Sequence, residues 1–232
     1  MRILHTSDTH GLPAPITHKC IDVIVHSGDL FPDPPLENGH RHENIQLWQQ
    51  DWFKANIEGF KSWSFGRPLL FCLGNHDHIC GEWLEKELRS IGIDATCLND
   101  KLVSFGGLNW YGLPYVEYIN GWHAYELNDD EMKDKVDAMV NTINASTGID
   151  VLGAHQPPMR ILDCDLRNML HWGNQRLNDA LFKDIEEGKE PSAVLVGHCH
   201  SSRGIRMIGK NDRTILFSNA ATTQHVVEIG GR

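Results

Sequence analysis

The sequence has no hydrophobic run long enough to cross a membrane. Its apolar runs are strand-sized, and one of the strongest, Ile21 to Val25, contains Asp22, whereas a membrane-spanning helix needs about 20 apolar residues. The segment Met1 to His5 turns polar at once and lacks the apolar stretch of a secretory signal. We therefore expect no membrane association and a cytoplasmic location.

The six cysteines form no Cys-x-x-Cys pair. Without an export signal, we expect free, reduced thiols, because a cytosol keeps cysteines reduced.

Runs of lysine or arginine are also missing, and the net charge is −10. An acidic protein repels a polyanion unless it carries a local basic patch. We therefore expect no extended binding of nucleic acid. A small phosphate ester is compatible with this charge, provided that bound cations supply the missing positive charge.

The length of 232 residues and the hydrophobic content of 41% are ordinary for a globular protein with a substantial core. Neither an internal repeat nor a linker-like segment divides the chain. We expect residues 1–232 to form a single domain.

Short apolar runs bounded by turn-forming residues predict strands that are buried on both faces. They are Arg2 to His5, Ile21 to His26, Pro68 to Leu73, Asp150 to Ala154 and Ala193 to Val196. Hairpin strands are expected at 102–105, 109–112, 204–208, 214–218 and 225–229. Helical periodicity predicts helices over 43–63, 81–91, 129–144 and 174–187, the third beginning with the capping pair Asn128 and Glu131. The pattern indicates an α/β fold with mixed sheets.

A polar cluster follows each of the five buried strands, and histidine, with 14 copies, is prominent in these clusters. The clusters contain Asp8 and His10, then Asp29, then Asn75, His76 and Asp77, then His155, and finally His198 and His200. Because sites in α/β sheets form at the carboxyl ends of strands, we expect these side chains to meet at one rim. Asp8 and His10, and likewise His198 and His200, are two residues apart, so each pair points the same way on extended chain.

Carboxylate, imidazole and amide donors together suit Mn, Fe, Zn, Co or Ni better than Ca. Seven donors exceed the need of one ion, so we expect two divalent ions, with Asp29 between them. Two ions roughly 3.5–4 Å apart are the usual arrangement for hydrolysing phosphate esters.

Other histidines are expected to have structural roles. His5, His26 and His78 lie close to the clusters, and we expect them in the core or packed beside the site. His40, His42 and His225 are expected to be solvated or structural.

The order Asp-x-His, Gly-Asp, Gly-Asn-His-Asp, His and Gly-His-x-His resembles the calcineurin-like metallophosphoesterase superfamily. The resemblance implies the metallo-dependent phosphatase fold, a four-layer sandwich of two mixed β-sheets flanked by helices. It also implies that Asp8, His10 and His200 bind one metal, that Asn75, His155 and His198 bind the other, and that Asp29 bridges them. His76 would face the leaving group, with Asp77 orienting it, and Asn75 would also help to fix the phosphate. Manganese is the first expectation for the metal.

Within the superfamily, the chain is most similar to the small MPPED-type branch of phosphodiesterases. The similarity includes Tyr111-Gly-Leu-Pro114, His155-Gln-Pro-Pro158 and the end Ser218-Asn219-Ala220. Two residues depart from that branch, because Gln156 stands where glycine is usual and Asp77 stands where glutamate is frequent.

The activity implied is that of a phosphodiesterase that hydrolyses small nucleotide-type diesters through a hydroxide held between the metals. A phosphomonoesterase, a nuclease and a scaffold without catalysis are the alternatives. Loops 31–42 and 113–128 and the segment 201–203 are expected to rim the site, with Trp122, His123 and Arg203 as candidate substrate contacts.

Overall fold

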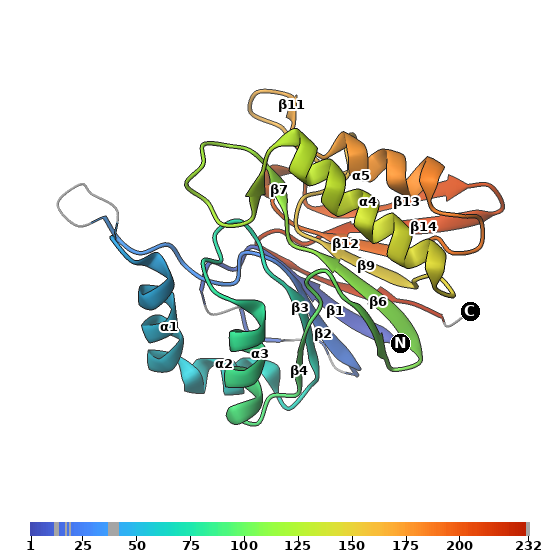
Figure 1. Cartoon of the computed structure of the whole chain (residues 1–232). Coiled ribbons are helices and arrows are strands. Elements are labelled where there is room, and N and C mark those ends of the chain that lie inside the picture. Colours follow the sequence, from blue (N-terminus) through green and yellow to red (C-terminus); the bar gives the residue numbers. More distant parts are fainter. Residues whose placement is uncertain (12–13, 17, 19, 37–41, 231–232) are drawn as a thin grey trace.

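Two large mixed β-sheets pack face to face, and helices cover the outer face of each sheet (Figure 1). The computed structural model describes residues 1–11, 14–16, 18, 20–36 and 42–230, so the expectation for His40 lies outside the described residues. The layers run helix, sheet, sheet, helix. The predicted four-layer α/β sandwich is therefore confirmed.

The first sheet has the strand order β15-β1-β2-β3-β4. Strands β1 (Arg2–Thr6), β2 (Val23–Ser27), β3 (Leu69–Cys72) and β4 (Ala95–Cys97) are parallel, whereas β15 (Gln224–Glu228) is antiparallel to β1. Every residue of β2 and β3 is buried. Continuous apolar runs are expected for strands covered on both faces.

The second sheet has the strand order β13-β14-β12-β9-β6-β5. Strands β6 (Leu108–Leu113), β9 (Val151–Ala154), β12 (Ala193–Val196) and β14 (Arg213–Asn219) are parallel to one another. The edge strands β5 (Leu102–Phe105) and β13 (Gly204–Lys210) run antiparallel and close the two predicted hairpins.

Two small strand pairs lie beyond the large sheets. Strand β7 (Val116–Glu117) pairs with β8 (Glu126–Leu127), and β10 (Cys164–Asp165) pairs with β11 (Leu170–His171). Strand β4 and these four strands were not predicted, because two or three residues are too few for a periodic pattern.

Helices α1 (Ile45–Ala55), α2 (Ile57–Ser64) and α3 (Gly81–Ser90) cover the first sheet, and α4 (Asp129–Ala145) and α5 (Gln175–Asp179) cover the second (Figure 1). The single helix expected over 43–63 is two helices that break at Asn56, whose backbone N–H caps the Phe53 carbonyl. Helix α5 is shorter than expected and continues as a π-helical turn, Ala180–Asp184. No helix of the described ranges has the length and apolar character needed to cross a membrane.

The capping pair at the start of α4 is confirmed. Asn128 Oδ1 accepts a hydrogen bond from the Glu131 N–H at 3.0 Å, and Glu131 Oε2 accepts one from the Asn128 N–H at 3.0 Å. The reciprocal bonds satisfy two N–H groups that the first helical turn leaves free.

Three apolar clusters fill the layers. Ile3, Trp110 and Leu195 belong to the cluster between the two sheets. Phe60 belongs to the cluster under α1 to α3, and Met139 to the cluster under α4 and α5. The sandwich therefore keeps both sheets in fixed positions, so their strand ends can form one site.

We predict that Phe60→Ala lowers the free energy of unfolding by about 3–5 kcal/mol, because it empties a fully buried site. The Phe60 ring is 0% exposed and lies 5.0 Å from the Phe53 ring. The same substitution at Phe65, whose side chain is 69% exposed, serves as the control and should cost less than about 0.5 kcal/mol. Urea unfolding measures both values, and equal losses would contradict the packing described.

Candidate metal centre

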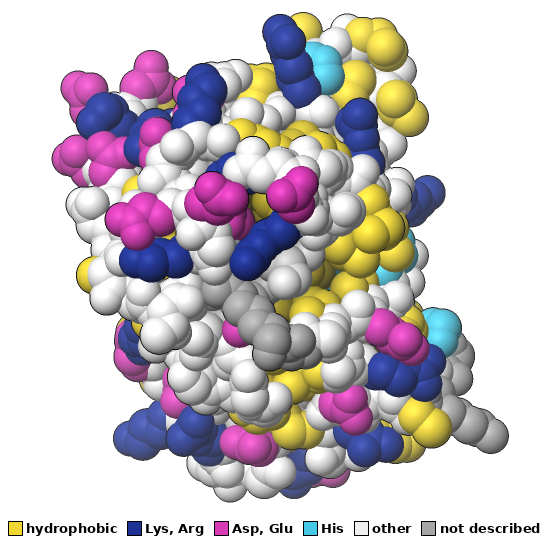
Figure 2. Space-filling view, turned by 90° about the vertical axis from the view of Figure 1, so that its right-hand side faces the viewer, with side chains coloured by type: hydrophobic (Ala, Val, Ile, Leu, Met, Phe, Trp, Pro, Cys, Tyr) yellow, Lys and Arg dark blue, Asp and Glu magenta, His cyan; other side chains and the backbone are white. Residues whose placement is uncertain are grey.

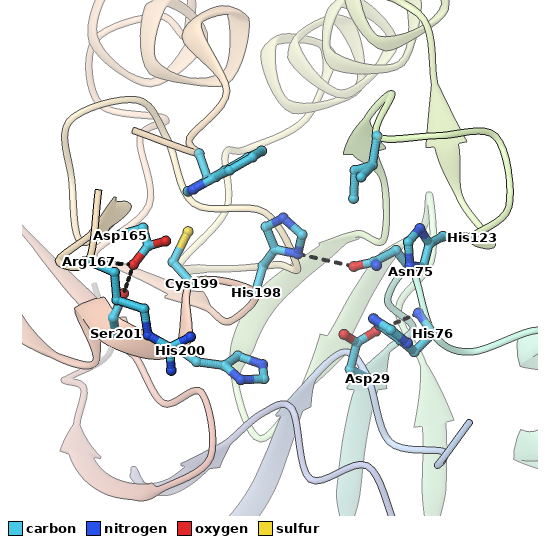
Figure 3. A pocket seen from close by; sticks show the side chains of 12 residues that line it. Asp29, Asn75, His76, His123, Asp165, Arg167, His198, Cys199, His200 and Ser201 are labelled. Atoms are coloured by element: carbon cyan, nitrogen blue, oxygen red, sulfur yellow. Dashed lines mark hydrogen bonds between the residues drawn. The ribbon is translucent and has the colours of Figure 1, made fainter. Parts of the chain in front are cut away.

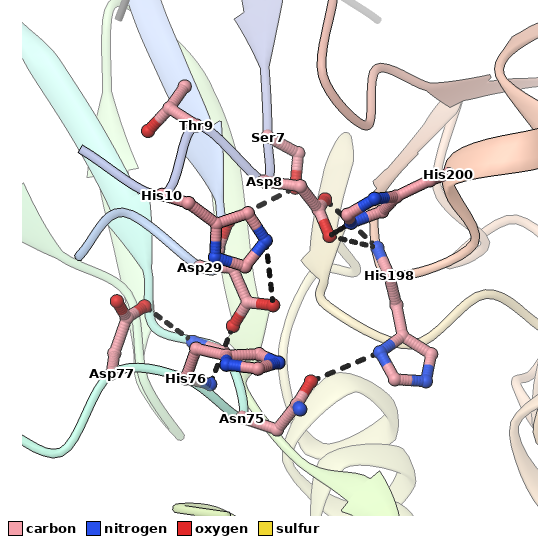
Figure 4. Close-up of polar contacts among 12 residues, drawn as sticks. Ser7, Asp8, Thr9, His10, Asp29, Asn75, His76, Asp77, His198 and His200 are labelled. Atoms are coloured by element: carbon pink, nitrogen blue, oxygen red, sulfur yellow. Dashed lines mark hydrogen bonds and ion pairs between the residues drawn. The ribbon is translucent and has the colours of Figure 1, made fainter. Parts of the chain in front are cut away.

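The predicted clusters meet at the carboxyl ends of five parallel strands (Figure 4). Asp8 follows β1, Asp29 follows β2, Asn75 follows β3, and His155 follows β9; His198 follows β12. Hydrogen bonds join the sheets here; in two of them, the His155 ring Nδ1 lies 2.9 Å from the Ser27 carbonyl, and the His198 N–H donates to the Asp8 carboxylate at 2.9 Å. The structure thus brings side chains from both sheets to one rim.

The backbone turns sharply at several of these residues. Asp8, His10, Asp29 and His198 have φ values of 53°, 43°, 57° and 64°, in the left-handed region. That region costs non-glycine residues roughly 1–2 kcal/mol each. The expectation of extended chain at 8–10 and 198–200 is therefore wrong, and the side chains reach the site from turns.

The first group of donors consists of Asp8, His10 and His200, whose ligand atoms all lie within 4.8 Å of one another. Asp8 Oδ1 is 3.0 Å from His200 Nε2. Asp8 is buried, whereas His10 and His200 line cavities. This group matches the set that the resemblance assigns to one metal.

The second group consists of Asn75, His155 and His198. Asn75 Oδ1 lies 2.9 Å from His155 Nε2 and 3.0 Å from His198 Nδ1. Asp29 Oδ2 is 3.2 Å from His155 Nε2 and 4.0 Å from His10 Nε2. Asp29 therefore lies between the two groups, where the resemblance places a bridging carboxylate. His198 and His200 face different groups, so the pair does not converge on one point.

The protonation of His155 shows why a cation fits here. Its Nδ1 faces a carbonyl oxygen and must carry the hydrogen, so in the neutral ring Nε2 presents a lone pair to Asn75 Oδ1 and Asp29 Oδ2. Three acceptors that face one another require a positive charge between them. Burial alone would lower the pKa of His155, but the nearby Asp29 and Asp8 carboxylates raise it to about 9. A divalent ion supplies the same charge with a suitable donor set.

The charge states of His198 and Asp29 also suit metal binding. Burial and the positive charge of His155 lower the pKa of His198 to about 4, so its ring is neutral and one ring nitrogen keeps a lone pair. Burial opposes ionisation of Asp29, but the adjacent His155 holds the pKa of that carboxyl well below its usual range. Both groups are thus available to a metal at neutral pH.

His76 is held by a carboxylate that the sequence analysis missed. Both oxygens of Asp33 lie 2.9 Å from His76 Nδ1. Burial would lower the pKa of His76, but the hydrogen bond to Asp33 and the Asp29 charge raise it. The spacing was the available signal, because Asp33 follows Asp29 by four residues in a loop expected at the rim. That loop is described up to Leu36 and from His42 onward.

Asp77 does not orient His76, so that expectation is wrong. Its two oxygens instead accept hydrogen bonds from the Phe31 and Gly74 N–H groups, each at 2.8 Å. Burial and the Asp29 charge raise the pKa of Asp77 to about 7. Asp77 therefore fixes the backbone of the turn that carries Asn75 and His76.

A cavity of about 410 Å³ opens above the donors (Figure 3). Its walls include His123 as expected, and Ile119 and Ser201 from two segments expected at the rim, together with three residues that were not predicted: Asp165, Arg167 and Trp172. The His123 ring lies 4.8 Å from the His76 ring, and its Nδ1 lies 2.8 Å from Glu126 Oε1.

The other two candidate substrate contacts lie elsewhere. The Trp122 ring is 6.4 Å from His76 and 5.6 Å from His78. Arg203 donates to Thr222 Oγ1 at 3.3 Å, and Thr222 lines a second cavity beside Asp8 and His10. The structure therefore does not bring Arg203 to the cavity above the donors.

The histidines expected to be structural are packed beside the site. His5 is fully buried, with Nδ1 2.8 Å from Ser218 Oγ and Nε2 2.9 Å from Ser27 Oγ. His26 is also fully buried and lies 3.1 Å from Thr9 Oγ1. His225 Nδ1 lies 2.9 Å from the same Ser218 hydroxyl.

Comparison with known proteins agrees with this geometry. Residues 1–207 match the family described as calcineurin-like phosphoesterase. The chain belongs to this family. Membership places it among phosphoesterases that typically bind divalent metals, and it supports the expected class, a metal-dependent phosphoester hydrolase.

Relatives support the finer resemblance. The human and mouse proteins named metallophosphoesterase domain-containing protein 1 are each 24% identical over 228 residues, which is 95% of this chain. A UPF0046 protein of Caenorhabditis elegans is 24% identical over 234 residues, covering 95% of this chain and 69% of its own length. The chain spans 65% of the length of the human and mouse relatives. The similarity to the MPPED-type branch is thus confirmed.

The fold recurs in a crystal structure that superposes with a TM-score of 0.63 over 99% of both chains, at 13% sequence identity. At this identity, the likeness shows the fold alone.

We predict that Asp33→Asn lowers the catalytic rate, whereas Asp77→Asn lowers the folding stability. Asp33→Asn removes the charge that holds His76 and should lower kcat by roughly 10–100-fold with unchanged stability. Asp77→Asn leaves a buried N–H without an acceptor and should lower the free energy of unfolding by about 1–3 kcal/mol. Steady-state kinetics and urea unfolding of both variants measure these effects. A catalytic loss confined to Asp77→Asn would restore Asp77 as the residue that orients His76.

Proposed function

We propose that the protein is a metal-dependent phosphodiesterase that hydrolyses small nucleotide-type diesters. The observation that carries this proposal is the convergence of two donor groups, joined by Asp29, beside a histidine held by Asp33. A cavity of about 410 Å³ above them suits a small ligand.

The residues of the chain have distinct tasks in this proposal. Asp8, His10 and His200 would hold one ion, and Asn75, His155 and His198 the other. When bound, such ions lower the pKa of a water molecule and offset the charge of the phosphate. The hydrogen bond to Asp33 raises the pKa of His76, and His76 would donate a proton to the leaving oxygen.

We further propose that manganese is the physiological metal, with Fe, Zn, Ni or Co as alternatives. Support comes from the donor set, in which carboxylate oxygens, imidazole nitrogens and an amide oxygen are mixed.

The surface supports a small substrate over a long polyanion. Figure 2 shows one face of the molecule, on which Lys and Arg side chains are scattered among Asp and Glu and form no continuous basic patch. The net charge of −10 acts against nucleic-acid binding in the same way.

We also propose that the two sheets act as a single domain in the cytoplasm. The shared site at their strand ends supports the first statement, and the six free cysteines support the second.

We predict that the Mn²⁺-loaded protein hydrolyses bis(p-nitrophenyl) phosphate with a higher kcat/KM than p-nitrophenyl phosphate. A cyclic nucleotide should also be a substrate, and EDTA should abolish turnover until Mn²⁺ is restored. Absorbance at the nitrophenolate band and nucleotide chromatography measure these rates. Preference for the monoester would favour a phosphomonoesterase, and no turnover with metal bound would favour a scaffold.

We predict that Asp29→Ala loses metal and activity together, because Asp29 lies between both donor groups. His76→Ala should keep its metal content but lose turnover by roughly 10²–10⁴-fold. Elemental analysis of the purified variants, paired with kinetics, distinguishes the two effects. Two metals and full activity in Asp29→Ala would disprove the bridging role.

A further inference from the structure

Two segments that contribute no metal donor form the outer walls of the cavity (Figure 3). One is the loop after β7, which carries Ile119. The other is the β10–β11 hairpin with the residue that follows it, carrying Arg167 and Trp172. The Ile119 and Trp172 side chains are 38% and 43% exposed, so large apolar surfaces remain open.

Gln156 connects both walls to the metal centre. It directly follows His155 and is 5% exposed. Its Oε1 accepts a hydrogen bond from the Glu117 N–H at 3.1 Å, and its Nε2 donates to the Trp172 carbonyl at 2.9 Å. One buried amide thus fixes the distance between the two walls.

The base of the hairpin is fixed by Asp163, which is 1% exposed. The Asp163 carbonyl accepts a hydrogen bond from the Trp172 N–H at 2.9 Å, and the carboxylate accepts from the Arg160 and Gly173 N–H groups at 2.8 and 3.2 Å. A Cβ on Gly173 would lie 2.6 Å from that carboxylate, so the backbone here is closely packed. The backbone at Trp172 is therefore held by hydrogen bonds, so the position of the indole is preorganised for ligand binding.

Arg167 adds a positive charge to the same wall. Among the cavity-lining residues that the structure describes, it is the only Lys or Arg, and its guanidinium forms no ion pair with any described residue. In Figure 3 its side chain extends toward His200, at the end of the cavity where one donor group lies. An unpaired guanidinium in an acidic protein is suited to an oxygen of a phosphate.

We propose that this hairpin is the substrate-recognition wall and that it selects diesters carrying a flat, nucleoside-type ring. The ring packs on Trp172 opposite Ile119, Arg167 contacts the phosphate, and Gln156 is a positioning residue that sets the width of the slot. This inference rests on the proposed phosphodiesterase function.

The polar groups beside Trp172 favour a nucleoside over an alkyl chain. Asp165 and Ser201 line the cavity, and Asp165 Oδ1 accepts hydrogen bonds from the Ser201 hydroxyl at 3.3 Å and from the Arg167 N–H at 3.0 Å. The carboxylate can accept a further hydrogen bond from a base or sugar whose ring covers the indole, whereas an alkyl chain has no donor for it.

The test compares two esters with the same leaving group, thymidine 5′-(p-nitrophenyl phosphate) and ethyl p-nitrophenyl phosphate, on the Mn²⁺-loaded protein. The selectivity is the ratio of their kcat/KM values. Because a base–aromatic stack is equivalent to roughly a 5- to 100-fold change in binding, Trp172→Ala should lower the selectivity by about that factor. Trp172→Phe should retain most of the selectivity, because phenylalanine also offers an aromatic face.

Three further variants complete the test. Arg167→Met should lower kcat/KM for both esters by a similar factor of about 10–100, because the phosphate is common to them. Gln156→Met should lower the selectivity in the same direction as Trp172→Ala. Met169→Ala is the matched control, since this hairpin side chain is 69% exposed and does not line the cavity; it should change neither rate.

Binding of thymidine 5′-phosphate, measured by equilibrium dialysis, separates this inference from the proposed function. If the wild type hydrolyses neither ester, the proposed phosphodiesterase function is wrong. Weaker binding of thymidine 5′-phosphate by Trp172→Ala than by Met169→Ala would then still support the substrate-recognition wall. If both esters are hydrolysed but Trp172→Ala keeps the selectivity, the inference is overturned while the function stands.

Discussion

The site depends on one hydrogen bond between the two sheets, from the ring of His155 on the second sheet to the carbonyl of Ser27 on the first. The bond fixes the tautomer of His155. It lies at the end of β2, the strand that Asp29 follows. Because Nδ1 is committed to the carbonyl, Nε2 of the neutral ring faces Asn75 and Asp29 as an acceptor. The cation requirement of the centre follows from this arrangement, and the sandwich packing keeps it in place.

Much of the fold was predictable because buried parallel strands have an unmistakable pattern. Residues Val23 to Val25 and Val151 to Ala154 are apolar or small throughout, and turn formers follow each strand. The donors were predictable for the same reason, since each one comes directly after such a strand. The break at Asn56 was not predictable, because the helical periodicity continues across it, and the pairs β7–β8 and β10–β11 were not, because two-residue strands are too short for a periodic pattern.

The role of Asp77 was misassigned, and that of Asp33 missed, for a physical reason. Adjacency in the sequence suggested that Asp77 serves His76, but in the turn Asp77 points into the core and binds backbone N–H groups. Asp33 reaches His76 from a loop 43 residues earlier in the chain. Gln156 stands where the similar branch usually has glycine. Its role was likewise not predictable, because its hydrogen-bond partners Glu117 and Trp172 lie on separate segments.

The left-handed backbone at Asp8, His10, Asp29 and His198 links metal loading to the fold itself. Side chains with a Cβ resist that conformation, at roughly 1–2 kcal/mol each. An ion that binds only the folded chain favours it by mass action, so binding offsets this torsional cost. Ion uptake is therefore coupled to the rigidity of the strand ends as well as to chemistry.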